Sequence, residues 1–266
     1  MRVAVCLSGQ LRQWEIAKEN QKWFWESCIG TEVKEVDYFI HTWNYSGDRE
    51  GVSQPYITRD VSQEEFDNVV DWYKPKKYFL DDKKQNYFYE SDHWSSLFYS
   101  MAQSIMLKRE YEIENNFEYD VVIKSRPDVV FDPIYHFSWE HLENNILYTT
   151  HGGNMEHEFG MYNVNDCVFY SNSYTMDLVS QMYSYRQKML DERNMFEDKL
   201  FTGPIGPGVL MNEYFRDYGI TAQSIQACKY NFVETLVKLG CPEDLDLFEH
   251  NDFHKMEKYF RDWYLK

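Results

Sequence analysis

The sequence predicts an α/β protein built on a Rossmann-like, mostly parallel β-sheet with helices on both faces. Over residues 2–131, short apolar runs alternate with longer segments whose apolar residues recur at helical spacing. The apolar runs are continuous, which is typical of strands buried on both faces of a parallel sheet. An alternation of strands and helices favours a sheet that is covered on each side. At 266 residues the chain is long enough for one large domain with a substantial core.

The first half of the chain supplies the clearest elements. Ser62 and Glu65 form a capping box in front of an apolar helix, and Pro75 follows the end of that helix. The polar segment 44–60 has loop chemistry throughout, and a loop of this length is functional or mobile. The predicted elements, in chain order, are a strand at 2–8, a helix at 12–28, a strand at 36–43, a helix at 63–73, a strand at 76–82, a helix at 92–115 and a strand at 121–124.

The second half is less regular. Gly219 is a plausible C-cap, and Ile220 begins another extended segment. The C-terminal segment is acidic and aromatic, as expected of a helix on the surface. The predicted features are a Gly-rich loop at 151–160, an aromatic strand at 168–170, a helix from Ser173 past Met182, a turn at 201–208, a helix at 209–219 and the surface helix within 237–266.

Polar residues follow three of the predicted strands at their carboxyl ends. Because the carboxyl ends of parallel strands meet at one edge of a sheet, these residues are expected to converge on one rim, where such sheets bind ligands. Simpler interpretations stay open: Arg126 only pairs with Asp128 or caps a helix, and Ser8–Gly9 forms only a tight turn. The residues are Ser8, Gly9, Gln10 and Arg12 after the first strand, His41, Thr42 and Asn44 after the second, and Lys124, Arg126 and Asp128 in the segment VVIKSRPDVVFDP.

Asp128 and Asp132 are the candidate ligands of a metal ion. Paired carboxylates hold Mg²⁺ or Mn²⁺ while phosphate groups of a substrate complete the coordination, and a neighbouring arginine offers a bidentate fork to phosphate. A nucleotide diphosphate would account for both kinds of charge, because it binds the arginine directly and the carboxylates through the metal ion. Alternatively, Asp132 starts a turn before Pro133, and Asp128 accepts backbone hydrogen bonds.

Composition and missing motifs exclude several classes of protein. A net charge of -17 and a pI near 4.9 argue against binding to nucleic acid. No apolar run approaches the roughly 20 residues of a membrane span, so we expect a cytoplasmic protein. The sequence lacks a phosphate loop, a G-x-G-x-x-G fingerprint and a G-x-S-x-G nucleophile elbow. Five scattered cysteines indicate reduced thiols, and His250 and His254 are interpreted as solvated, not metal-bound.

Four short motifs, in this order, resemble those of bacterial and viral glycosyltransferase-like proteins, which look like variants of the nucleotide-diphospho-sugar transferase A fold. The motifs are VAVCLSGQLR at the N-terminus, DYFIHTWN at the second strand, IKSRPDVVF around Arg126 and NDCVFYSN around Asp166. The resemblance implies a single glycosyltransferase-A-like domain over 1–266, in which 1–132 bind the nucleotide and 133–266 bind the acceptor. The D-x-x-x-D spacing of Asp128 and Asp132 departs from the D-x-D metal motif common in such enzymes.

The resemblance also implies roles for individual residues. Asp166 is the expected general base and Asp128 the second catalytic carboxylate, and the implied cofactor is Mn²⁺ or Mg²⁺ at Asp128 and Asp132. Lys124 and Arg12 are expected to help Arg126 stabilise the charge on the leaving group. The residues expected to contact the nucleotide sugar are Ser8, Gly9, Gln10, Arg12, His41, Lys124 and Arg126.

The favoured function is therefore transfer of a sugar from a nucleotide-sugar donor to a glycan or another hydroxyl acceptor. The second hypothesis is a non-catalytic carbohydrate- or nucleotide-binding module on the same fold, because aromatic residues make up 18% of the chain and stack on sugars. A phosphotransferase is a third and weaker hypothesis, since the sequence places no base and metal pair for it. Release of free nucleotide diphosphate from a nucleotide sugar would distinguish the first hypothesis from the second.

Overall fold

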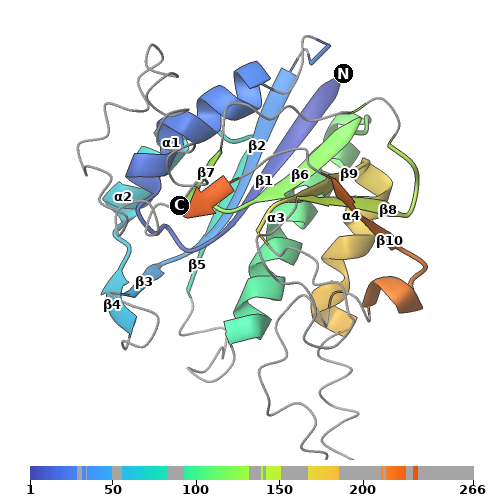
Figure 1. Cartoon of the computed structure of the whole chain (residues 1–266). Helices are drawn as coiled ribbons and strands as arrows, with labels where there is room; N and C mark the ends of the chain where they lie inside the picture. The colour runs from blue at the N-terminus through green and yellow to red at the C-terminus, as the bar shows by residue number, and fades with distance from the viewer. Residues whose placement is uncertain are drawn as a thin grey trace, which may run out of the picture.

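A computed structural model describes residues 1–28, 32–33, 35–49, 56–82, 93–131, 139, 142–150, 167–185, 211, 214–225 and 230–232. Its central feature is a seven-stranded sheet in the order β10 (Thr221–Ile225), β8 (Ile146–Thr150), β9 (Phe169–Ser171), β6 (Val121–Ser125), β1 (Arg2–Gly9), β2 (Glu35–Trp43) and β5 (Lys77–Asp81) (Figure 1). Strands β1, β2, β5 and β6 are parallel, and β10 is parallel to β8. Only β9 runs antiparallel to its neighbours β6 and β8 within this described sheet. The sheet is therefore mostly parallel, as predicted.

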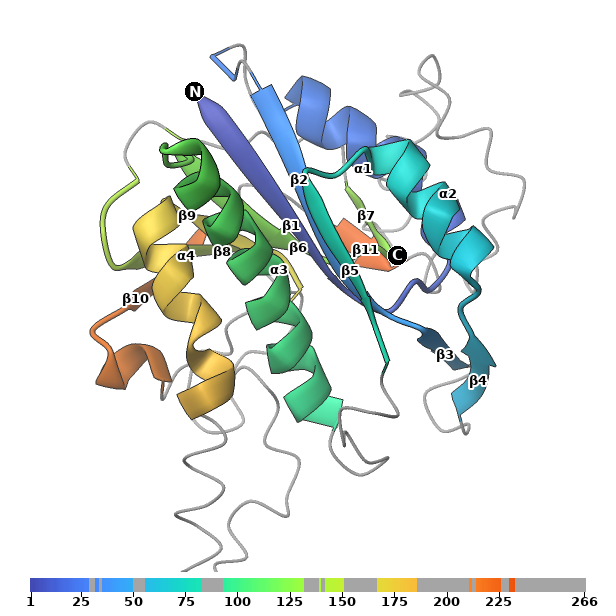
Figure 2. The ribbon, with the colours of Figure 1, turned by 180° about the vertical axis from the view of Figure 1, so that it is seen from behind.

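Helices cover both faces of the sheet, as Figures 1 and 2 show from opposite sides. The helices α1 (Trp14–Trp23) and α2 (Gln63–Tyr73) pack on one face, and α3 (His93–Asn115) and α4 (Ser173–Ser180) pack on the other. Side chains of β1 alternate between the two cores, with Val5 and Leu7 facing α1 and α2, and Ala4 and Cys6 facing α3 and α4. The predicted fold class, a mostly parallel α/β sheet with helices on both faces, is confirmed.

The ends of α2 follow the predicted local chemistry. The Ser62 hydroxyl accepts a hydrogen bond from the backbone N–H of Glu65 at 3.1 Å. At the other end, Lys74 adopts a left-handed conformation with φ of 48° immediately before Pro75, which cannot continue a helix. Gly219 has φ of 67°, which fits its predicted position after a helical segment.

Two small sheets were not predicted. The segment 44–60, expected to be loop throughout, contains an antiparallel hairpin of β3 (Tyr45–Arg49) and β4 (Tyr56–Asp60), so that expectation was wrong. The run Tyr-Ile-Thr that opens β4 has the aromatic and β-branched residues that favour strands. The second sheet pairs β7 (Val129–Phe131) with β11 (Tyr230–Phe232), which brings a C-terminal segment against the chain that follows β6. The predicted helix at 12–28 ends in a π-helical turn, η1 (Phe24–Cys28).

A buried ion cluster joins α3 to α4. The Lys108 side chain is fully buried, and its Nζ donates to Glu112 Oε2 at 2.9 Å, Asp177 Oδ1 at 2.8 Å and Ser173 Oγ at 2.6 Å. Glu112 also accepts from the backbone N–H of Tyr119 at 2.8 Å. Because buried charges are stable only when paired and hydrogen-bonded, the cluster fixes the two helices relative to each other.

Among the parts of the chain that the structure describes, no helix has the length and apolar character needed to cross a membrane. The predicted Gly-rich loop at 151–160 and the predicted surface helix within 237–266 lie outside the described residues.

Candidate functional site

The strand order reverses between β1 and β6. The chain proceeds outward from β1 to β2 and β5, and then β6 returns to the opposite side of β1. Ligands of open α/β sheets bind beyond the carboxyl ends of the strands at such a switch point. Leu7 is aligned with Ser125, so Ser8 and Gly9 at the end of β1 lie beside the residues that follow β6. On the other side of β1, Ser8 is aligned with His41 and Gly9 with Thr42, whose hydroxyl donates to the Gly9 carbonyl at 2.7 Å. The ends of all three strands expected at the rim thus lie side by side.

Arg126 and Asp128 form a bidentate pair at this rim. Arg126 Nε donates to Asp128 Oδ1 at 2.8 Å, and Nη2 donates to Oδ2 at 2.5 Å. The Asp128 side chain is 8% exposed and that of Arg126 is 20% exposed. The simpler interpretation, that Arg126 pairs with Asp128, is correct for this structure. The guanidinium is held in one orientation, and a phosphate that binds its Nε–Nη2 edge must displace Asp128.

A buried amide of α1 holds the backbone of the same loop. Gln21 Nε2 donates to the carbonyl oxygens of Arg126 at 3.0 Å, Pro127 at 2.9 Å and Val129 at 2.8 Å. The Tyr73 hydroxyl of α2 donates to Gln21 Oε1 at 3.1 Å, which fixes the direction of the amide. Gln21 therefore determines the path of the chain on which Arg126 is mounted.

The neighbouring residue of α1 extends this contact to β7. Asn20 Nδ2 donates to the Phe131 carbonyl at 3.0 Å, and Asn20 Oδ1 accepts from the Phe131 N–H at 2.7 Å. Neither amide was singled out from the sequence. The sequence signal that could have identified them is the pair of adjacent amide side chains, Asn20 and Gln21, on or beside the apolar face of the predicted helix.

The loop after β1 is held by its own polar groups. Gln10 Oε1 accepts from Arg12 Nε and from the backbone N–H of Gly47, both at 2.9 Å. Gly9 has φ of 119°, which side-chain-bearing residues rarely adopt, and apart from its two chain neighbours no atom of the described residues lies within 4 Å of the position a Cβ would take. The Ser8 hydroxyl is buried and has no hydrogen-bond partner among the described residues. The switch point therefore holds Gly9, whose backbone no side chain covers, and the unpaired hydroxyl of Ser8.

His41 links the rim to α3. Its side chain is fully buried, with Nδ1 2.9 Å from Ser100 Oγ and Nε2 3.3 Å from Asp81 Oδ2. The Gly9 N–H donates to the same Ser100 hydroxyl at 2.9 Å. Burial lowers the pKa of His41 and outweighs the opposing effect of Asp81. The neutral imidazole of His41 thus contacts Gly9 through the Ser100 hydroxyl. A direct contact between His41 and a nucleotide stays a prediction.

Lys124 lies inside the molecule, on the side of the sheet that faces α3 and α4. Its side chain is fully buried, and Nζ donates to the Cys167 carbonyl at 3.3 Å and lies 5.7 Å from the centre of the Phe169 ring. The contact ties β6 to the start of β9. A contribution of Lys124 to the charge at the rim also stays a prediction.

The remaining candidates are the two carboxylates Asp132 and Asp166, which lie outside the described residues. No group of three or more His, Cys, Asp or Glu side chains suited to a metal ion occurs within the described ranges. Both oxygens of Asp128 accept hydrogen bonds from Arg126. In this arrangement the described residues do not fit a divalent cation, and the predicted Mn²⁺ or Mg²⁺ stays untested.

Comparison with known proteins adds little to this geometry. No protein-family model matches the sequence, and no curated protein matches it. Among solved structures, the chain is similar to one described as a glycosyltransferase involved in the glycosylation of the major capsid of PBCV-1, with 11% sequence identity and a TM-score of 0.39. The match covers 85% of this chain and 82% of that chain. A TM-score this low does not establish a common fold, so the assignment of the fold class depends on the strand order.

Proposed function

We propose that the chain is a glycosyltransferase that binds the diphosphate of a nucleotide sugar at the rim between β1 and β6 and transfers the sugar to a hydroxyl acceptor. The observation that carries the proposal is the reversal of strand order at this rim, where the loops after β1 and β6 meet. Switch points of this kind are the usual ligand sites of open α/β sheets. The residue chemistry at the rim then selects the ligand.

The chemistry favours a diphosphate for three reasons. Arg126 presents a planar fork that matches phosphate geometry, and Arg12 adds a second guanidinium on the neighbouring loop. Gly9 allows close approach of a ligand to the backbone, and the orphan Ser8 hydroxyl offers one more hydrogen bond. In a chain with a net charge of -17, cations gathered at one rim are the attractive feature for an anionic ligand.

In the proposed reaction, the acceptor oxygen attacks the anomeric carbon of the donor sugar. The bond from that carbon to the diphosphate oxygen breaks, and Arg126 and Arg12 stabilise the charge left on the nucleotide diphosphate. Asp166 accepts the proton of the acceptor hydroxyl, as the sequence predicts. Gln21 contributes by holding the loop that carries Arg126, which limits the reorganisation needed when the donor binds.

A non-catalytic binding module is the second candidate. The observation in its favour is that Asp128, expected to act in catalysis, has both oxygens engaged by Arg126. A module of this kind would bind a nucleotide diphosphate at the rim without breaking the bond to the sugar.

The test is to measure nucleotide binding by thermal shift and donor hydrolysis by release of free nucleotide diphosphate. A ligand present at 100 times its Kd stabilises the native state by about 2.7 kcal/mol, which a melting curve resolves. Arg126→Lys keeps the charge but loses the fork, and we expect affinity for UDP or GDP to fall roughly tenfold, about 1.4 kcal/mol. Arg216→Lys, on a surface arginine that is 75% exposed, is the matched control.

Three outcomes decide between the candidates. Binding with slow release of nucleotide diphosphate supports the transferase. Binding to the rim without any release, with or without sugar acceptors, supports the module. Binding that Arg126→Lys leaves as tight as in the parent protein contradicts the proposed site.

A further inference from the structure

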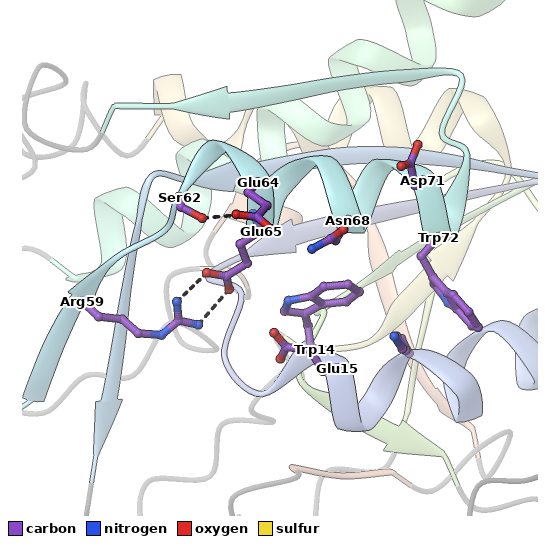
Figure 3. A pocket seen from close by; sticks show the side chains of 10 residues that line it. Trp14, Glu15, Arg59, Ser62, Glu64, Glu65, Asn68, Asp71 and Trp72 are labelled. Atoms are coloured by element: carbon purple, nitrogen blue, oxygen red, sulfur yellow. Dashed lines mark hydrogen bonds and ion pairs between the residues drawn. The ribbon is translucent and has the colours of Figure 1, made fainter.

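The groove between α1 and α2 selects no ligand. It has a volume of about 590 Å³, and Figure 3 shows the residues that line it. Arg59 donates to Glu65 at 2.6 and 2.9 Å, so this cation is already paired. The ammonium of Lys18 lies 5.3 Å from the centre of the Trp14 ring and 4.7 Å from that of Trp72. The groups that could recognise a ligand in this groove are therefore engaged with one another.

The edge of the sheet at β5 is different. Within the described part of the chain, β5 pairs with β2 and has no strand on its other side (Figure 2). Tyr78 and Phe79, in the middle of β5, are 49% and 50% exposed. The Tyr78 ring packs on Phe66 of α2, whereas Phe79 lies on the opposite face of the sheet, near His41. An edge strand that exposes aromatic side chains on both faces favours pairing with a further strand.

The backbone groups on the open side of β5 belong to Tyr78 and Leu80. The Asn44 N–H donates to the Asp81 carbonyl at 2.8 Å, in register with the parallel ladder of β2 and β5. The peptide groups of successive strand residues point to opposite sides of the strand. Those of Asp81 and Phe79 therefore face β2, and those of Tyr78 and Leu80 face the open edge.

The sequence of this edge is self-complementary in charge. The segment 76–82 reads KKYFLDD, with two cations before an apolar centre and two anions after it. When a second copy pairs with it in the antiparallel direction about Phe79, the cations of each copy lie opposite the anions of the other. A parallel arrangement would place like charges side by side, which destabilises pairs of strands. The charges thus select an antiparallel copy of the same segment.

The register that the charges select is also one that the backbone allows. In this register Tyr78 of each copy lies opposite Leu80 of the other, and both residues direct their peptide groups to the open edge. They therefore form hydrogen-bonded pairs of an antiparallel ladder. Phe79 lies opposite its own counterpart in a non-hydrogen-bonded pair, where side chains approach most closely and aromatic rings stabilise the contact. A shift by one residue would set outward groups against inward ones.

The cation and the anion at the two ends of the segment are accessible. Lys76 pairs with Asp37 at 3.2 Å, yet 36% of its side chain is exposed. The Asp81 side chain is 8% exposed and bonded to His41, so the half-buried Asp82 is the carboxylate that Lys76 of another copy reaches. Because the chain has a net charge of -17, two copies attract each other only where opposite charges meet, as they do along this segment.

We propose that two copies of this chain form a symmetric dimer through β5, in which their sheets join into one and Lys76 of each copy pairs with Asp82 of the other. The same surface serves both copies, as in most dimers with two-fold symmetry. Each copy keeps its own rim, because β1 and β6 lie inside the sheet and not at its edge. The dimer does not depend on the proposed transferase reaction.

The experiment is analytical ultracentrifugation of the full chain from micromolar to submillimolar concentration. We expect the mass to rise from the 32.2 kDa of one chain to twice that value. Phe79→Lys places two ammonium groups opposite each other at the centre of the interface and should raise the dimer Kd roughly tenfold or more. Tyr174→Lys, on an aromatic residue of α4 that is 54% exposed, is the matched control and should leave the Kd unchanged.

A pair of charge reversals tests the register. Lys76→Glu and Asp82→Lys each set like charges against each other in a dimer of the single variant, so each should raise the dimer Kd roughly tenfold. A mixture of the two variants restores opposite charges at both ends of the interface, and a mixed dimer should form with a Kd close to that of the parent protein. Hydrogen exchange at the amides of Tyr78 and Leu80 should be slower in the dimer than in the monomer.

The proposal is overturned if the chain keeps the mass of one copy at every concentration. A dimer that forms equally well in Phe79→Lys and in both charge variants would place the contact on another surface and overturn it too. If Phe79→Lys does not fold, the charge variants decide alone: a mixture that associates no better than either variant by itself contradicts the antiparallel register.

Discussion

Replacing Gln21 with methionine removes the contact that shapes the rim without changing the volume or the helix propensity of the residue much. In Gln21→Met, the buried carbonyls of Pro127 and Val129 lose their donor, and the buried hydroxyl of Tyr73 loses its acceptor. A buried polar group that loses its partner costs about 1–3 kcal/mol, and the groups can relax in part. We therefore expect the free energy of unfolding to fall by about 2–4 kcal/mol.

Urea denaturation of the full chain measures this loss. Gln63→Met, which removes an exposed amide from α2, is the matched control and should change stability by less than about 0.5 kcal/mol. Because Gln21 fixes the loop that carries Arg126, Gln21→Met should also weaken UDP binding at temperatures where the variant is folded. An unfolding free energy equal to that of the parent protein would refute the structural role of the amide. Lower stability with unchanged UDP binding would show that the loop held by Gln21 does not determine UDP binding.

Three further predictions concern the buried charges. Lys108→Met leaves Glu112 without its cation and Asp177 with only the half-exposed Arg109, and it should lower the free energy of unfolding by about 3–5 kcal/mol in urea denaturation. Lys77→Met at the surface should leave the urea midpoint close to that of the parent protein. Burial lowers the pKa of His41, so its contribution to stability is complete above the unfolded pKa of about 6.5 and is lost as the pH falls through the folded pKa; the urea midpoint should decrease on acidification, and less so in His41→Gln. Since both oxygens of Asp128 accept from Arg126, we expect UDP binding to survive EDTA, and a loss of binding that Mn²⁺ restores would instead support the predicted metal.

The sequence was sufficient for the parts of the fold that depend on periodicity and local chemistry. Alternating apolar runs predicted β1, β2, β5 and β6, and the pair Ser62 and Glu65 predicted the start of α2. The convergence of Gly9 and Arg126 also followed, because parallel strands align their carboxyl ends. The hairpin at 45–60 was missed because its polar side chains obscured a short β-branched run.

The side-chain partners at the site were beyond reach, since they depend on contacts between residues far apart in the chain. Gln21 contacts the loop after β6, which is more than 100 positions away in the sequence. The spacing of residues predicts which face of the helix Gln21 occupies, but it does not predict its hydrogen-bond partners. The directions of His41 and Lys124 follow from strand parity, which assigns both to the side of α3 once the sheet is known. Without the register of the strands, the position of His41 and Lys124 at strand ends led to the prediction that both side chains contact a ligand.

The pair of Arg126 and Asp128 has a consequence for which anions the rim accepts. A carboxylate two residues away is present at a high effective concentration, so it acts as a tethered competitor for the guanidinium fork. A weakly held anion such as chloride or acetate must displace this competitor and offers no additional contact in return. In the proposed site a diphosphate would carry more charge than these anions and would also contact Arg12 and Gly9, which would offset the cost of displacing Asp128. The tethered carboxylate would in this way reject abundant small anions and leave the rim responsive to a ligand with several phosphate oxygens.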